Sequence, residues 1–449
     1  MNKNIFCKFF DSNILFFLIF SFIFISVYNS FMFIGIIEDG HHHFWEAITS
    51  INPLVGHEGF NNFPFNSRLF PNFLSHSITS FISKYNFCNI KILLYIFTFV
   101  SYITPLLFLI LIYFNLPKKH KNIFEFITLY FLICLNFMSY QIWTENLLTG
   151  LFIYGLFTIY NYSDFTNLSK VNLVSLPLFS VFIISSHPMV TIFIPILLLI
   201  SIEKYIKGKN INLVTKIILL SSFVLLIYAF FFNCYYIINP IFLENSYFKF
   251  SIFFNYKYIL FFLSIFSIII LSILKLNKNI TKPISITLLT LLFLISIFNF
   301  PPNLSFNFRT IGLYIPLLFL FFLLFLYIRN ISINYNLIHI LNILIIMIII
   351  INTIYYGSNW NNYIKELNTK IQNSHSLELN DIAKFDLAHN HAFAFIFIYV
   401  YYCFNNNNDV VLHIKKTNNW LSKHIETQII DKRNIPKYMN IQKLINLED

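Results

Sequence analysis

The sequence predicts an all-α membrane protein: a polytopic helical bundle of about 11 transmembrane helices, with a long first outer loop and a small C-terminal extramembrane segment. Of the 449 residues, 57% are hydrophobic and only 11% are charged. A water-soluble domain of this composition could not bury all of its apolar surface away from water. Apolar runs of about 18 or more residues recur from Ile14 to Ile354, and each can cross ~30 Å of hydrocarbon as a helix. A transmembrane β-barrel would instead show alternating residues.

The first predicted span, residues 14–37, is too long for the apolar core of a signal peptide and lacks a small-residue cleavage site, so we expect it to be retained. The pair 172–186 and 188–202 is short, and one broken helix is the alternative there. A transmembrane domain over residues 1–356 is thus predicted. The further spans are expected at 90–114, 123–141, 144–161, 172–186, 188–202, 211–233, 258–274, 283–299, 310–328 and 337–355.

Basic residues predict the orientation, because cytoplasmic loops of membrane proteins carry an excess of lysine and arginine. With the N-terminus inside, that side holds Lys3, Lys8, Lys118, Lys119, Lys121, Lys170, Lys204, Lys207, Lys209, Lys275, Lys278, Lys282 and Arg329. The opposite short loops hold Arg68, Lys84, Lys249, Lys257 and Arg309. The net charge of +11 is therefore explained by orientation, and no nucleic-acid partner is expected. An odd number of crossings places residues 357–449 on the outer side.

The first outer loop, residues 38–89, is by far the longest connection between predicted spans. It begins with Glu38-Asp39-Gly40, which places two carboxylates at the membrane surface. Further on, the segment from Ser67 to His76 opens an amphipathic stretch that is able to lie flat on the bilayer.

Tryptophan and cysteine are scarce and therefore informative. Trp45, Trp143 and Trp360 lie next to predicted span ends, which favours an aromatic belt at the level of the lipid headgroups. The five cysteines show no metal-ligand or redox spacing. A disulfide between Cys88 and Cys234, on the same predicted side, is left open as an alternative.

Other predicted outer loops are short, yet several carry one conspicuous polar group. Glu145 caps the hairpin of spans three and four, His187 caps the next hairpin, and Arg309 precedes span ten. Carboxylates at the mouth of a bundle can accept a proton from a hydroxyl group or bind a divalent cation. The planar guanidinium of arginine matches phosphate oxygens. Together such groups suit a site that takes a lipid-phosphate substrate from the bilayer.

In this layout the chain resembles the GT-C superfamily, multispanning glycosyltransferases that use polyprenyl-phosphate sugars as donors. Glu38-Asp39 lies where those enzymes carry a first-loop acidic residue, and Glu145 lies where some carry a second acid. Asp39-Gly40 followed by Ser67-Arg68-Leu69-Phe70 is also similar to patterns of bacterial O-antigen glucosyltransferase-like membrane proteins. The resemblance implies a bacterial cell-membrane enzyme of envelope polysaccharide biosynthesis.

The resemblance also implies roles for individual residues. Asp39 would be the general base for an acceptor hydroxyl, or the ligand of a divalent cation, with Glu38 as its substitute. Arg309 would hold the donor phosphate, supported by Arg68 and His187. The partners would be membrane lipids, a lipid-linked sugar donor and a glycan, lipid or protein acceptor. No Trp-Trp-Asp signature of oligosaccharyltransferases and no Asp-Glu pair of protein O-mannosyltransferases is present, so subfamily and acceptor stay open.

Alternative interpretations remain for these residues and for the whole chain. The first-loop acids are also explained if they are simply solvated at the membrane surface. Glu145 and His187 are also explained as ordinary polar residues of short turns. Arg309 is also explained as an anchor whose long side chain reaches the membrane surface and sets the depth of span ten. A transporter or flippase of lipid-linked saccharides predicts ionisable groups near the bilayer midplane, and Glu125 comes nearest to that. A polysaccharide polymerase or ligase would normally place its largest outer loop late in the chain, whereas here it is first.

Overall fold

The structure is a computed structural model. It describes residues 14–32, 44, 47–48, 69–84, 90–117, 120–137, 145–184, 186, 190–207, 211–238, 335–374, 376–377, 412–415 and 445–448. The spans predicted at 258–274, 283–299 and 310–328 lie outside these residues.

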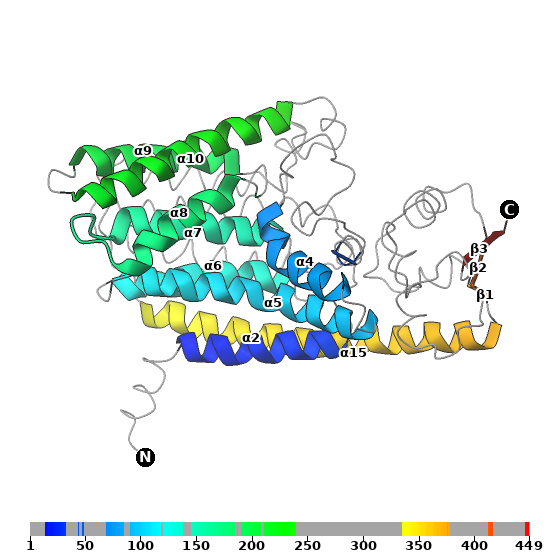
Figure 1. Cartoon of the computed structure of the whole chain (residues 1–449). Helices are drawn as coiled ribbons and strands as arrows, with labels where there is room; N and C mark the ends of the chain where they lie inside the picture. Colours follow the sequence, from blue (N-terminus) through cyan, green and yellow to red (C-terminus); the bar gives the residue numbers. More distant parts are fainter. Residues whose placement is uncertain are drawn as a thin grey trace, which may run out of the picture. The chain divides into compact units, whose positions relative to one another are not determined.

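The described part of the chain is helical over most of its length (Figure 1). Its helices are α2 (Ile14–Phe31), α4 (Leu69–Lys84), α5 (Ile90–Asn115), α6 (Lys121–Phe137), α7 (Glu145–Tyr162), α8 (Lys170–Ile184), α9 (Val190–Lys207), α10 (Leu213–Ile238) and α15 (Tyr335–Ser374). Among them, four stretches are long and apolar enough to cross a membrane: Ile14–Phe31, Ile90–Asn115, Leu213–Tyr235 and Ile338–Glu366. The chain is therefore an α-helical integral membrane protein, as predicted.

Exposed apolar side chains follow one face of α10. They recur every three or four residues, which is the spacing of one helix face. In water so long an apolar surface would be unfavourable, whereas hydrocarbon chains solvate it. The stripe consists of Leu213, Val214, Ile217, Leu220, Val224, Tyr228, Phe231 and Tyr235.

The chain divides into two compact units. Unit 1 consists of Met1–Leu18, Leu107–Phe137 and Thr144–Ile348, and unit 2 consists of Ile19–Leu106, Met138–Trp143 and Ile349–Asp449. The division falls within α2, α5 and α15, so each of these helices contributes residues to both units.

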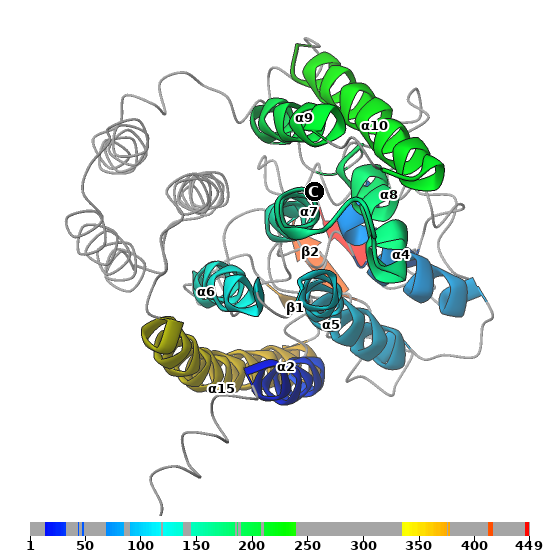
Figure 2. The ribbon, with the colours of Figure 1, turned by 90° about the vertical axis from the view of Figure 1, so that its left-hand side faces the viewer.

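Unit 1 is a bundle in which α10 packs on α8 and α9, α7 packs on both of those helices, and α6 packs on α7 (Figure 2). Aromatic rings fill its interior: the Phe108 ring lies 4.9 Å from Phe152 and 5.5 Å from Phe182, measured between centroids. Two helices begin at side-chain caps. The Asn172 N–H donates to Ser169 Oγ at the start of α8, and the Thr215 N–H donates to Asn212 Oδ1 at the start of α10.

Unit 2 contains α4 together with the unit 2 parts of α2, α5 and α15. The Tyr28 hydroxyl of α2 donates to the Ile354 carbonyl of α15 over 3.0 Å. On α5, the centroid of the Phe97 ring lies 5.4 Å from that of Phe44 and 6.1 Å from that of His76 in α4. Phe44 and His76 of the first outer loop, which is predicted as a long connection, thus contact α5.

The helix α4 confirms the predicted amphipathic stretch, but its faces point the opposite way from a helix lying on the bilayer surface. Its apolar side chains Ile78 and Phe81 are exposed, Phe81 by 60%. Its polar side is buried and carries Ser75, His76, Thr79, Ser80 and Ser83. A surface-lying helix would present that polar side to water, whereas α4 packs its polar side on the protein and leaves its apolar side exposed.

The C-terminal segment differs from the prediction in two ways. The last predicted span ends at residue 355, whereas α15 continues without a break to Ser374. Buried residues continue at helical spacing past that point, at Gly357, Trp360 and Ile364. The segment also forms a parallel three-stranded sheet in the order β1 (Ser376–Leu377), β2 (Leu412–Lys415) and β3 (Ile445–Glu448), which an all-α prediction does not include.

One further expectation is corrected. Trp360, expected in an aromatic belt facing lipid headgroups, is completely buried, with its ring 5.5 Å from that of Tyr363. Cys234 is a free thiol, and Cys88, the other cysteine of the disulfide left open above, lies outside the described residues. The tryptophans Trp45 and Trp143 lie outside the described residues.

Candidate functional site

The residues that the sequence places in a catalytic site fall almost entirely outside the described part of the chain. Only Glu145 lies in a described element, as the first residue of α7. Whether these side chains converge therefore stays a prediction. The residues outside are Glu38, Asp39, Arg68, His187 and Arg309.

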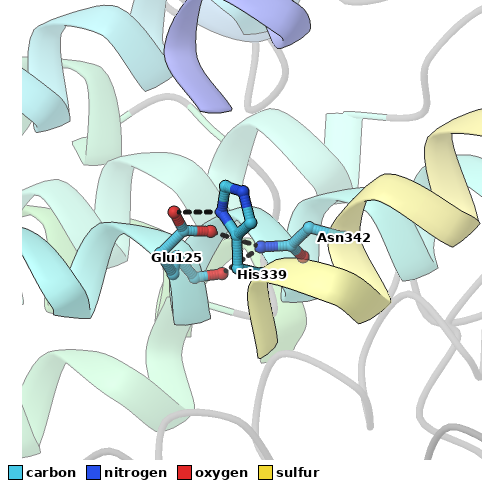
Figure 3. A network of polar contacts seen from close by, with 3 residues as sticks. All are labelled: Glu125, His339 and Asn342. Carbon is cyan, nitrogen blue, oxygen red and sulfur yellow. Dashed lines mark hydrogen bonds and ion pairs between the residues drawn. The ribbon is translucent and has the colours of Figure 1, made fainter. Parts of the chain in front are cut away.

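The best-defined polar centre of the described residues joins α6 to α15 in unit 1 (Figure 3). Glu125 of α6 lies opposite His339 and Asn342 of α15. His339 Nδ1 is 2.9 Å from Glu125 Oε1, and the Asn342 side-chain N–H donates to Glu125 Oε2 over 2.8 Å. The same amide nitrogen lies 2.9 Å from the Glu125 backbone carbonyl oxygen, to which it also donates. Both carboxylate oxygens of one residue are thus engaged by one neighbouring helix.

Helix geometry explains why α15 can hold a carboxylate in this way. Residues three positions apart lie on the same face of a helix, so His339 and Asn342 both point toward α6. The His339 and Glu125 side chains are only 14% and 15% exposed. An ionisable side chain this far from water needs partners, and the two donors from α15 supply them.

The depth of this centre matters for what it can do. The apolar stretches begin at Ile123 in α6 and at Ile338 in α15. Glu125 and His339 come one or two residues later, a rise of ~1.5–3 Å along each helix. The centre therefore lies near the edge of the apolar region. A carboxylate, an imidazole and an amide at that place can bind one another and stabilise a helix pair, and a carboxylate–imidazole pair can also exchange a proton.

A neighbouring cation has a different partner. Lys121, one turn before Glu125, places its Nζ atom 3.5 Å from the centroid of the Tyr113 ring and donates to the Tyr113 backbone carbonyl. Tyr113 lies in the last turn of α5, where carbonyl groups lack helical partners and a positive charge is favourable. Burial lowers the pKa of the Lys121 ammonium group.

Sequence reasoning found only part of this centre. Glu125 stood out as a charge within a predicted span, but His339 and Asn342 were not singled out. The available signal was a pair of polar residues, spaced three apart, at the start of an isoleucine-rich run. Pattern alone does not say which of the other helices such a pair faces, because the contact joins residues more than 200 positions apart.

A second polar region lies in unit 2, on the buried face of α4. The Ser83 hydroxyl donates to the Ile48 carbonyl over 3.5 Å, and the His76 ring contacts Phe97. The hydroxyls of Thr79 and Ser80 are buried and have no hydrogen-bond partner among the described residues. Hydroxyl groups and an imidazole can hydrogen-bond to a hydroxylated ligand.

Among the described residues, no group of three or more His, Cys, Asp or Glu side chains is placed to hold a metal ion. No protein-family model matches the chain, and no curated protein and no solved structure matches it either.

Proposed function

We propose that the protein is a membrane glycosyltransferase that transfers a sugar from a polyprenyl-phosphate donor to a glycan, lipid or protein acceptor on the extracytoplasmic face. The observation that carries the proposal is the inward polar face of α4. The loop that starts with Glu38 and Asp39 returns to the protein as a helix with apolar residues outward and hydroxyl groups inward. A loop that only connected two spans would have no reason to bury five polar side chains.

The chemistry assigned to this site follows from residue type and predicted side. Asp39 deprotonates the acceptor hydroxyl or binds a divalent cation that neutralises the departing phosphate, and Glu38 is its substitute. Arg309 binds the donor phosphate through its guanidinium group, with Arg68 and His187 as further contacts. Glu145 is the second acid. Loss of one charge-assisted contact of this kind costs about 1.5–3 kcal/mol of binding free energy.

The proposal is tested with purified protein in lipid vesicles and a panel of radiolabelled polyprenyl-phosphate sugars. The measured quantity is release of polyprenyl phosphate in the presence of extracted cell-envelope material as acceptor. We expect release by the natural protein and its loss in Asp39→Asn. Glu58→Gln, which changes an acid of the same loop outside the proposed site, is the matched control. An Asp39→Asn protein that inserts normally and retains full activity would contradict the assigned role of Asp39.

A second candidate function is transport of a lipid-linked saccharide. The observation in its favour is the paired carboxylate and imidazole of Glu125 and His339 inside the helices of unit 1. Movement of labelled lipid-linked saccharide across a vesicle membrane, without sugar transfer and abolished in Glu125→Gln, would support transport. The pair lies near the start of both helices and not at their midpoint, so this function ranks second.

A further inference from the structure

On α15, most of the side chains around the polar centre are isoleucines. On the buried face, Asn342 lies between Ile338 on one side and Ile345 and Ile346 on the other. A shift of α15 by one turn, ~5.4 Å, replaces one isoleucine by another along much of this run. Apolar packing alone therefore discriminates poorly between neighbouring registers of the helix.

The hydrogen bonds of the centre, in contrast, strongly favour one register of α15 over its neighbours. The three contacts of Glu125 with His339 and Asn342 measure 2.8–2.9 Å. A one-turn shift separates all of these atoms and breaks all three contacts between groups that are largely buried. Polar residues buried among apolar ones are known to select a register in coiled coils at some cost in stability.

We infer that Glu125, His339 and Asn342 form a register pin, by which we mean a polar contact that fixes the axial position of the isoleucine-rich helix α15 relative to α6. The pin acts between segments that enter the membrane at different stages of synthesis, since α6 precedes α15 by some 200 residues. It acts through hydrogen-bond pairing and not through net charge. The inference rests on these three contacts and is independent of the proposed transferase activity.

Disulfide cross-linking in a variant without native cysteines tests the pin. A cysteine at position Ile123 of α6 is combined in turn with single cysteines at successive positions 335–346 of α15, leaving 339 and 342 unchanged. The yield of cross-link against position reports the register. With the pin intact, we expect a yield confined to positions on one face within one turn.

Two variants remove the pin. The first replaces all three residues by leucine (Glu125→Leu, His339→Leu, Asn342→Leu), and the second carries Asn342→Leu alone, which removes two of the three bonds. We expect cross-links displaced by one turn to rise about tenfold in the triple variant and less in the single one. Glu125→Gln is the matched control, since its amide oxygen can still accept from the Asn342 side-chain N–H while its amide nitrogen donates to His339 Nδ1, which accepts when the imidazole proton is on Nε2.

The apolar triple variant is expected to insert and to remain folded, because replacing a buried polar cluster by apolar side chains is often neutral or stabilising. If it does not fold, the Asn342→Leu variant gives the decision. A cross-link pattern in these variants identical to that of the intact pin overturns the inference.

Discussion

Gly155 of α7 lies so close to Phe179 of α8 that a Cβ atom at the glycine would stand 2.6 Å from two carbons of the phenyl ring. Real Cβ atoms do not approach a ring so closely, so the absence of a side chain lets α7 and α8 pack together. A second glycine of α7, Gly150, makes the same kind of close approach to the Tyr130 hydroxyl of α6. Both contacts lie in unit 1.

Gly155→Ala is therefore expected to lower the free energy of unfolding by about 1–3 kcal/mol, since Phe179 is fully buried and has no room to move away. Thermal unfolding in detergent measures the effect. The double variant Gly155→Ala, Phe179→Leu replaces the phenyl ring by a smaller side chain. Its loss in free energy of unfolding should be smaller than the sum of the losses of the two single variants. Strict additivity of the single effects would show that the two residues do not limit each other.

Trp360 gives a prediction that separates interior packing from an aromatic belt. Because its side chain is completely buried, Trp360→Ala should cost about 3–5 kcal/mol of stability. Tyr355→Ala, at a side chain of the same helix that is 62% exposed, is the matched control and should cost little. Thermal unfolding of both variants in the same detergent makes the comparison. Equal and small losses in the two would favour the belt.

The exposed stripe of α10 predicts direct contact with lipid chains. Val224 is 56% exposed, whereas Leu226, two residues later, is fully buried. Nitroxide labels at these two positions in lipid vesicles should differ in collision with dissolved oxygen, which concentrates in hydrocarbon. We expect high oxygen accessibility and low accessibility to a water-soluble nickel complex at Val224, and low values of both at Leu226. The reverse order of oxygen accessibility would mean that the stripe is covered by protein.

Lys121 predicts a pH dependence of stability. Burial lowers its pKa below the ordinary value of 10.5, so between the lowered pKa and 10.5 the unfolded chain binds more protons than the folded one. The free energy of unfolding contributed by this group consequently rises with pH across that window. Thermal unfolding of Lys121→Met should lack this rise, whereas Lys216→Met, at an exposed lysine of α10, should keep it. A rise of equal size in Lys121→Met would assign it to other groups.

Much of the helical framework is predictable from sequence because hydrocarbon thickness sets a length that apolar runs must match. The start of α2 at Ile14 and of α5 at Ile90 agrees with the predicted spans. Hydropathy gives no such limit outside the bilayer, and for that reason the extension of α15 to Ser374 was missed. In that segment the sequence signal is the helical spacing of Trp360 and Ile364. The signal is weak because the two residues lie between asparagines, and asparagine is common throughout this chain.

The polar contacts were less predictable than the helices, for a different physical reason. Amphipathicity identifies α4 but not which of its sides faces the protein, because in a bilayer the apolar side of a helix can face lipid as well as protein. Likewise the isolated charge of Glu125 was visible, yet its partners come from a helix distant in sequence. Whether Asp39 and Arg309 converge depends on the same kind of long-range pairing, and both residues lie outside the described part of the chain.

The length of α15 means that one continuous helix passes through two solvents. At ~1.5 Å per residue its 40 residues extend roughly 60 Å, about twice the thickness of a hydrocarbon layer. Detergent or lipid composition should therefore govern the part around Ile345, whereas dissolved salt should govern the part around the exposed Lys365 and Glu366. A change of detergent should therefore alter the stability of the part around Ile345 more than that of the part around Lys365, and a change of salt concentration should do the opposite.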